Sequence, residues 1–233
     1  MNNYLVERNI LNIATIKNFE PIIFQDLQNN WIGFEAEILK QFATVMDIDI
    51  RFTVYPFDRI WSRPAQRQCD IAAAGLTILD ERLASGCIFS KPTLQFHQSL
   101  LINRIAKGDI KSFDDLAGIK VGIIPGTTGE KFARQYATKD TCFVEYDDEN
   151  TMLDALRRNS ISAIARGTLG NFYRSNTESQ FMLIESISDV EQVAFSVASQ
   201  PLLAVLNHHL KLFYDNGILQ QFAKRWSLLG CVL

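Results

Sequence analysis

Short apolar segments alternate with amphipathic ones along nearly the whole chain, and this alternation restricts the fold more than any other feature. Segments such as 11–15, 120–126 and 142–146 are rich in Val, Ile and Phe and end in turn residues, a pattern typical of strands. Segments 34–46 and 150–159 carry apolar residues at three- and four-residue spacings, which predicts helices. Such alternation favours an α/β fold with mostly parallel sheets. Further strands are expected at 48–55, 69–76, 99–104, 162–166, 181–185 and 193–198, and further helices at 57–68, 130–137, 168–176 and in a pair spanning 201–226.

Composition sets bounds on size and class. The chain has 233 residues, of which 47% are hydrophobic, so it can bury a sizeable core as one large domain or two smaller ones. A formal net charge of -3 provides no electrostatic reason to expect a nucleic-acid partner. No apolar run approaches the roughly 18 residues that a membrane span requires. Residues 1–9 lack the basic and apolar regions of a signal peptide, so either such a segment was removed from this chain or the protein stays in the cytosol.

The four cysteines, Cys69, Cys87, Cys142 and Cys231, show no spacing typical of a zinc site. Their even number permits two disulfides in an oxidising compartment without requiring them. Cys69 and Cys142 lie in or beside apolar strand-like segments, where a buried free thiol is the more common state. We therefore expect free thiols more than disulfides, and no metal or cofactor.

Residues 72–82 read AAAGLTILDER and indicate an anion site. Gly75 lets the backbone approach a ligand closely, and Thr77 adds a short hydroxyl. Arg82 provides a planar fork of donors that suits a carboxylate held by two charge-assisted hydrogen bonds. The alternatives are a surface ion pair of Arg82 with Asp80 or Glu81, and a strand-end or capping role for Thr77. The spacing of these residues, together with the resemblance described below, favours the ligand site.

A second segment, residues 121–136, repeats the order of strand, Gly/Thr turn and helix. Thr127 and Thr128 stand at the start of the expected helix, where exposed amides favour an anion. A threonine in this place often only caps the helix, and the two roles are compatible because a cap leaves backbone amides free. Two such half-sites in different parts of one chain indicate a cleft between two lobes.

Five segments of the chain are similar to segments of a known family. The periplasmic solute-binding proteins that serve amino-acid ABC transporters, solute-binding protein family 3, carry AAGMTITPER and then FSDPY where this chain has AAGLTILDER and then FSKP. Their SLADLKGKKVGVQAGTT is similar to SFDDLAGIKVGIIPGTT, and their DGTYDKIYEKW to DNGILQQFAKRW. The segments LNIATIKNFEPIIF and WIGFEAEILKQFATVMDIDIRF also match in order and spacing. The resemblance therefore covers nearly the whole chain.

The resemblance implies a two-lobed α/β protein of the type II periplasmic-binding fold with a ligand cleft between the lobes. Lobe one is expected at residues 1–103 plus 195–233, and lobe two at 104–194. The resemblance places Phe19 and Phe57 against the ligand's side chain, although core packing is the usual role of any one of the 16 Phe. It implies a monomeric, non-catalytic binding protein of the periplasm, with its signal segment removed. Its partners would be a small carboxylate, such as an amino acid, and a membrane permease.

One stretch departs from the family's pattern. Many amino-acid-binding relatives carry an Asp shortly after the lobe-two strand, in a stretch such as VVTD, where it pairs with the ligand's α-ammonium. This chain reads AIARG, with Arg166 and Gly167 in place of Thr and Asp. Either another acid, such as Glu191 or Glu20, supplies the pairing, or the ligand has no α-amino group. Arg166 either attracts a second anionic group of the ligand or is a solvated residue at the helix start.

Catalytic motifs are absent from the sequence, which contains no GxSxG, HExxH, P-loop or GxGxxG pattern. The histidines His97, His208 and His209 have no partner at catalytic spacing. Some proteins that resemble this chain are nevertheless enzymes, notably cyclohexadienyl dehydratases, and the same fold serves as the sensor domain of receptors. The alternatives to a transport binding protein are therefore a dehydratase-like enzyme and a sensor domain.

Overall fold

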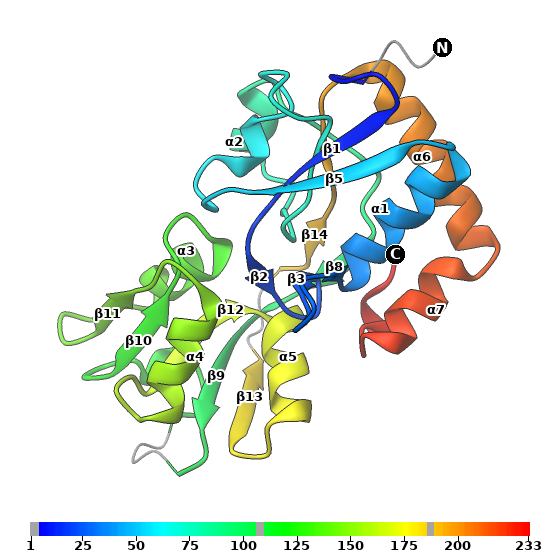
Figure 1. The fold of residues 1–233 in the computed structure, drawn as a ribbon. Helices are drawn as coiled ribbons and strands as arrows, with labels where there is room; N and C mark the ends of the chain where they lie inside the picture. The colour runs from blue at the N-terminus through cyan, green and yellow to red at the C-terminus, as the bar shows by residue number, and fades with distance from the viewer. Residues whose placement is uncertain (1–4, 106–109, 186–188) are drawn as a thin grey trace. The chain divides into compact units, whose positions relative to one another are not determined.

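A computed structural model describes residues 5–105, 110–185 and 189–233, and the chain divides into two compact units (Figure 1). The first unit comprises residues 1–95 and 191–233, and the second comprises residues 96–190. These bounds differ from the expected lobes at both crossings. Strand β9 (Gln98–Asn103) pairs within the second unit's sheet, whereas the expected division placed it in lobe one. Strand β14 (Glu191–Val193) belongs to the first unit, whereas the expected division placed it in lobe two.

The first unit contains most of the chain's helical mass. Its strands are β1 (Ile10–Thr15), β2 (Asn18–Phe19), β3 (Ile23–Gln25), β4 (Trp31–Ile32), β5 (Asp49–Val54), β6 (Ile71–Ala72), β7 (Ile88–Phe89), β8 (Leu94–Phe96, whose last residue opens the second unit), β14 and β15 (Ser196–Val197). Its helices are α1 (Phe34–Val45), α2 (Asp80–Ala84), α6 (Gln200–Asp215) and α7 (Ile218–Arg225), with 3-10 turns η1 (Ile60–Ser62) and η3 (Leu229–Cys231). Helices α1, α6 and α7 lie together on one flank of this unit (Figure 1). Gly217, at φ 74°, separates α6 from α7 where Asn216-Gly217 predicts a break.

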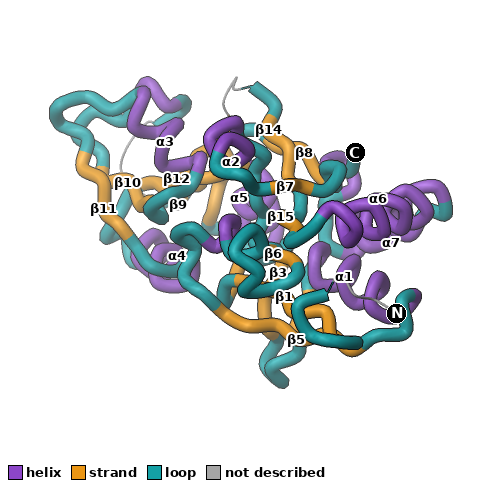
Figure 2. Tube along the Cα trace, turned by 90° about the horizontal axis from the view of Figure 1, so that it is seen from above, coloured by secondary structure: helices purple, strands orange, loops and turns teal. Residues whose placement is uncertain are grey.

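The second unit is built from β9, β10 (Lys120–Ile123), β11 (Cys142–Glu145), β12 (Ala163–Gly167) and β13 (Phe181–Glu185). Its helices are α3 (Thr128–Gln135), α4 (Glu149–Arg157) and α5 (Thr168–Thr177), preceded by the 3-10 turn η2 (Phe113–Asp115). Figure 2 shows α3 and α4 on opposite sides of β10 and β12. Alternate residues of β12 therefore belong to different cores. Ala163 and Ala165 pack in the cluster that includes α3, and Ile164 packs in the cluster that includes α4.

Each unit has a five-stranded sheet in which four strands run in one direction and one is opposed. The order is β5-β1-β6-β15-β7 in the first unit and β11-β10-β12-β9-β13 in the second. Strand β15 is antiparallel to β6 and β7, and β9 is antiparallel to β12 and β13, while the remaining neighbours are parallel. The predicted α/β fold with mostly parallel sheets is confirmed. Ligands of α/β sheets bind beyond the carboxyl ends of the parallel strands. The predicted site residues follow β1, β5, β6 and β10, and Arg166 lies at the carboxyl end of β12.

Several local predictions are wrong. Residues 57–68 form only the three-residue turn η1 instead of a helix, because Pro64 lacks an N–H and Arg59 and Arg67 adopt φ values of 56° and 58°. The strand expected at 69–76 ends after Ala72, and the chain then continues as a loop through Gly75. None of the four cysteines forms a disulfide, and Cys142 is exposed instead of buried. Among the described residues, no helix has the length and apolarity needed to cross a membrane.

Candidate functional site

Arg82 is the most unusual residue of the first unit. It lies in α2, downstream of β6, and only 3% of it is exposed. Its Nη1 donates to the Thr77 carbonyl oxygen at 2.8 Å, and its guanidinium lies 5.6 Å from the centroid of the Trp61 ring. Its buried Nε makes no hydrogen bond, and no carboxylate of the described residues forms an ion pair with it. Burial lowers the pKa of Arg82, and Glu81 and Glu191 offset this only through longer-range attraction.

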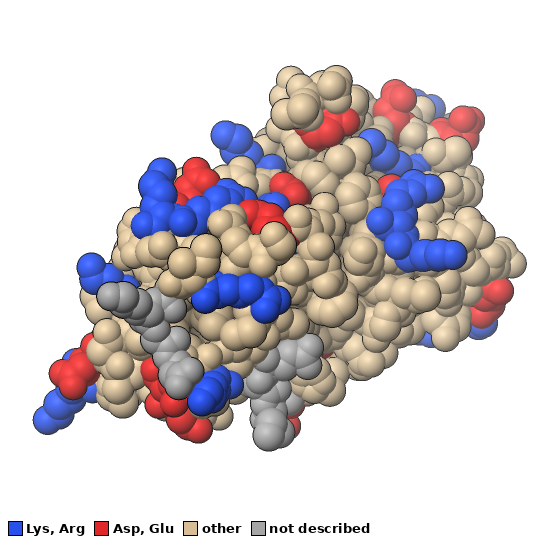
Figure 3. All heavy atoms as spheres, turned by 90° about the horizontal axis from the view of Figure 1, so that it is seen from below, with Lys and Arg blue, Asp and Glu red and all other residues tan. Residues whose placement is uncertain are grey.

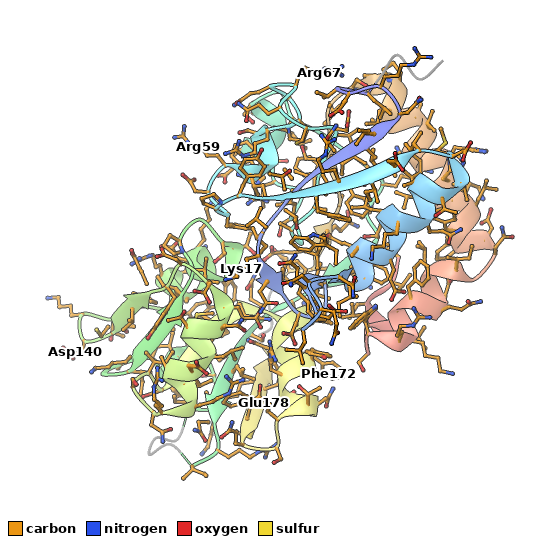
Figure 4. The ribbon with its side chains drawn as sticks, in the orientation of Figure 1. Lys17, Arg59, Arg67, Asp140, Phe172 and Glu178 are labelled. Atoms are coloured by element: carbon orange, nitrogen blue, oxygen red, sulfur yellow. The ribbon has the colours of Figure 1, made fainter. Side chains whose placement is uncertain are left out.

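The loop before Arg82 brings three predicted residues together. Gly75 has a φ of 62°, a conformation that favours glycine, and a Cβ at this position would lie 2.4 Å from Cε1 of Phe19. The Phe19 ring, from β2 just after the turn that contains Lys17 (Figure 4), therefore packs directly against Gly75. Thr77 is buried and forms an isolated bridge with Val193 of β14. Phe19, Gly75, Thr77 and Arg82 are thus joined by direct contacts.

Phe57 has a different environment. It is half-buried and packs against a cluster of buried apolar residues, as does Trp61. The members of this cluster, which come from β1, η1, β6 and the loops beside β6, are Ala14, Ile60, Cys69, Ala72, Ala74 and Leu76. This is the packing role that the sequence allowed for Phe57. Among the described residues, the Trp61 ring lies near the Arg82 guanidinium, and no such ring contact involves Phe57.

Glu35 was not singled out by the sequence, yet it is part of the same arrangement. It lies in the first turn of α1, is fully buried, and its Oε2 accepts the Gly75 N–H at 3.1 Å. Burial raises the pKa of Glu35 to about 8, because the ionised form loses its hydration. In the sequence it reads as an ordinary acid at a helix N-terminus. No pattern of spacing could have shown that it contacts a residue 40 positions away.

The second unit presents the N-terminus of α3. Thr127 is the N-cap: its Oγ1 accepts the Glu130 N–H at 3.2 Å and donates to the Ile124 carbonyl at 2.8 Å. The Thr128 hydroxyl accepts a hydrogen bond from Nε2 of the buried Gln98 at 2.9 Å. The backbone N–H groups of Thr128 and Gly129 donate to no acceptor among the described residues. The capping role of Thr127 is confirmed, and two amides remain at the positive end of the helix.

Arg166 lies at the end of β12 on the side of the sheet that packs against α4. Its Nη1 is 2.9 Å from Oε1 of Glu149, the first residue of α4, and the Arg166 side chain is 12% exposed. Arg174 of α5 contacts the same carboxylate oxygen at 3.2 Å. Gly170 makes room for this arrangement, because a Cβ there would lie 1.3 Å from Nη2 of Arg166. Arg166 is therefore a largely buried residue paired with Glu149 and not a solvated helix-start residue, and its predicted contact with a second anionic group of the ligand stays a prediction.

The ion pairs continue from this triad to the far end of α5. Arg174 lies 3.6 Å from Glu178, which Figure 4 labels beyond the end of that helix. Arg157 of α4 pairs with Glu178 at 2.7 Å and with Asp154 at 2.7 Å. The network joins α4 to α5 and holds the end of β12 between them.

Gly167 faces the other side of β12. A Cβ at this position would lie 2.5 Å from two ring carbons of Phe96, so the aromatic ring occupies the place of a side chain at 167. Gly129, on the first turn of α3, similarly has no room for a Cβ, which would lie 2.6 Å from the Cα of Arg166. The α3 amides therefore lie close to the end of β12. The described acids of this region are engaged, Glu149 with the two arginines and Glu130 with the Gly126 N–H and Arg134.

The chemistry of these groups is that of anion binding. A buried guanidinium without a carboxylate partner is unfavourable, so an anion that reached Arg82 would compensate its charge. Unpaired amides at a helix N-terminus have the same preference. Within the described residues, no group of three or more His, Cys, Asp or Glu is arranged to hold a metal ion. The face of the molecule in Figure 3 carries acidic and basic side chains interspersed with wide uncharged areas.

A family model and several known proteins match this chain over most of its length. The model for "Bacterial extracellular solute-binding proteins, family 3" matches residues 11–229. The L-cystine-binding protein TcyJ of Escherichia coli is 27% identical over 227 residues, covering 96% of this chain and 85% of that protein. ABC transporter arginine-binding protein 1 of Escherichia coli is 25% identical over 222 residues, covering 91% of this chain and 87% of that protein.

Solved structures show the same architecture. An ancestral arginine-binding protein bound to glutamine has a TM-score of 0.85 and 22% identity, covering 95% of this chain and 99% of that one. The substrate-binding protein AbpA from Streptococcus pneumoniae, bound to L-arginine, has a TM-score of 0.85 and 18% identity, covering 94% of each chain. At such identities the likeness shows the fold alone, whereas the family match spans nearly the full sequence. The chain belongs to the bacterial extracellular solute-binding proteins of family 3.

Proposed function

We propose that this protein binds a small carboxylate, an amino acid or a close analogue, as the non-catalytic ligand-binding component of an ABC transporter. The buried Arg82 guanidinium, which has a carbonyl but no carboxylate as partner, is the observation that supports this function most strongly. A charged group that is buried in a protein loses its hydration, and a partner of opposite charge must compensate this loss. A ligand carboxylate held by two charge-assisted hydrogen bonds would do so.

The two units would supply two halves of one site. Arg82 and Thr77 form the half-site of the first unit, and the Thr128 and Gly129 amides at the start of α3 form that of the second. Binding would then favour a closed form, because only there does the carboxylate reach both sets of donors. Phe19, which packs on Gly75, would contact the remainder of the ligand. Thr127 would contribute indirectly, because its hydroxyl caps α3 and has its hydrogen bonds within the helix start.

The surroundings of Gly167 restrict the ligand's second functional group. Within the described residues of the second unit, Glu149 and Glu130 are engaged by other partners, and Phe96 fills the space that an acidic side chain at 167 would need. A charge-assisted hydrogen bond of roughly 1.5 to 3 kcal/mol is thereby lost for ordinary α-amino acids, unless Glu191 or Glu20 provides it. A ligand with another polar or acidic group, or without an α-amino group, would bind better than a simple neutral amino acid. Because Arg166 pairs with Glu149, its role would be mainly structural.

The biological setting follows from the family. The protein would work in the periplasm as a monomer and deliver its ligand to a membrane permease. The relatives named above bind L-cystine and arginine, and these two compounds are the first probes to try.

A thermal-shift screen of amino acids, keto acids and dicarboxylates tests the function. A ligand at a hundred times its Kd stabilises the folded protein by about 2.7 kcal/mol, which corresponds to a rise in Tm of roughly 5–10 °C for a chain of this size. Small-angle scattering with the best ligand should then show a smaller radius of gyration. A screen in which no carboxylate shifts the Tm contradicts the proposed function. A tight binder that leaves the radius unchanged contradicts the shared site.

A further inference from the structure

Glu35 has an environment that is rare for an acidic side chain. It is fully buried, the only described hydrogen bond of its carboxyl group is the one that Oε2 accepts from Gly75, and its Oε1 has no hydrogen-bond partner among the described residues. Helix α1 packs against α7 and β5, and several charged groups of these elements have other partners. Arg225 pairs with Glu37, Lys40 donates to the Trp31 carbonyl oxygen, and Arg51 pairs with Glu7. Among the described residues, Asp49, Lys224 and Glu20 form no hydrogen bond or ion pair with the Glu35 carboxyl.

These surroundings favour the neutral form of the carboxyl group. An ionised carboxylate with one neutral donor and no cation is strongly disfavoured in a protein interior. Burial accordingly raises the pKa of Glu35 to about 8, and the Gly75 hydrogen bond opposes this only in part. At neutral pH the group is therefore a carboxylic acid.

The single partner of Glu35 is part of the candidate site. Gly75 adopts a φ of 62°, and its N–H points at Oε2 while the Phe19 ring covers it. Two residues later, the Thr77 carbonyl accepts from Arg82. A continuous series of contacts thus runs from Glu35 through Gly75 and Thr77 to the guanidinium.

We propose that Glu35 is a positioning residue that holds the Gly75–Thr77 loop, and with it Arg82, in the binding geometry as a neutral acid, so that its ionisation at alkaline pH loosens the site. The expected effect on ligand affinity rests on the proposed function, whereas the expected effect on the loop concerns the unliganded protein. Ionisation requires water or a cation to reach a carboxyl group that is fully buried and hydrogen-bonded to the Gly75 N–H. We therefore expect the loop that carries Gly75 to shift when the proton leaves.

The first test uses the unliganded protein. Amide hydrogen exchange at Gly75 is compared at pH 6 in the unmodified protein, Glu35→Gln, Glu35→Leu and the control Glu37→Gln, which removes a carboxyl from the same helical turn without touching Gly75. The Gln variant retains an acceptor and should keep the protection. The Leu variant removes the acceptor and should lose about tenfold in protection, the equivalent of one hydrogen bond of about 1.4 kcal/mol. Unchanged protection in a folded Glu35→Leu variant overturns the positioning role.

The second test uses pH and a ligand. The probe is whichever of L-arginine and L-cystine gives the larger thermal shift, or inorganic phosphate as a minimal anion if neither does. If only the neutral form is competent, apparent affinity should fall about tenfold between pH 7 and pH 9 in the unmodified protein. The Glu35→Gln variant should lose no more than about twofold beyond the ligand's own titration, which both proteins share. Identical pH profiles in the two proteins overturn the protonation role. If no probe binds, the proposed function fails, while the exchange experiment still decides the inference.

Discussion

The replacement of Arg82 by Met gives the sharpest test of the binding site. Met has an apolar stem of similar length but lacks the guanidinium. A ligand carboxylate would lose two charge-assisted hydrogen bonds, on the order of 3 kcal/mol or more, so affinity should fall at least about a hundredfold. Isothermal titration calorimetry with the best ligand of the screen measures this loss directly. The control Arg51→Ala removes a half-exposed arginine of the same unit and should leave affinity unchanged.

The unliganded stability of the same variant separates a binding residue from a structural one. Removing the guanidinium leaves the Thr77 carbonyl without its partner, at a cost of about 1–3 kcal/mol. It also removes a buried cation that no carboxylate neutralises, and the desolvation penalty of such a group is several kcal/mol. We therefore expect Arg82→Met to unfold in urea at the same concentration as the unmodified protein, or at a higher one. A variant that is several kcal/mol less stable, or that binds ligand normally, would refute the reasoning.

Four further predictions concern the rest of the site. Thr128→Ala keeps the backbone amide and should bind ligand within a few-fold of normal, whereas Thr128→Pro, at a helix position that tolerates proline, removes the amide and should weaken binding about tenfold by calorimetry. Gly167→Asp should lower the Tm, because the new side chain would clash with the Phe96 ring. In a Phe96→Ala background the same substitution should improve the binding of α-amino acids if the ligand's ammonium lacks an acidic partner. Unchanged or weaker binding in that background indicates that an acid elsewhere pairs with the ammonium. Glu149→Gln leaves two buried arginines unneutralised and should cost about 3–5 kcal/mol in chemical denaturation, and a loss under 1 kcal/mol would contradict the structural role of the triad. Between pH 4.5 and about 8 the folded protein retains a proton on Glu35 that the unfolded chain has released. The free energy of unfolding should therefore fall with rising pH, by up to about 1.4 kcal/mol per pH unit. Urea unfolding at several pH values measures this slope, and Glu35→Gln should abolish the contribution of Glu35 to it.

The amino-acid sequence by itself determined the class of fold and the family. Strand and helix periodicities are local properties, so the sheets and most helices could be placed from the spacing of apolar residues. The resemblance in five ordered segments led to the family to which the chain belongs. The segment 57–68 shows the limit of such reasoning, because helical spacing there was outweighed by Pro64 and by two arginines in the left-handed region.

The roles of individual side chains were decided by tertiary structure. Arg82 could be named from its motif, but only packing shows that it is buried without a carboxylate. Arg166 stands at the end of a strand and just before a helix in the sequence. Its ion pair with Glu149 depends on which face of β12 it occupies and on the space that Gly170 leaves for its guanidinium.

The contacts of Gly167 with Phe96 and of Glu35 with Gly75 join residues 71 and 40 positions apart. The charge state of a carboxyl group depends on the water and partners that remain around it after folding, and these are supplied by distant parts of the chain. Local pattern therefore predicted where an anion could bind, while long-range packing decided which side chains are neutral, paired or available to bind it.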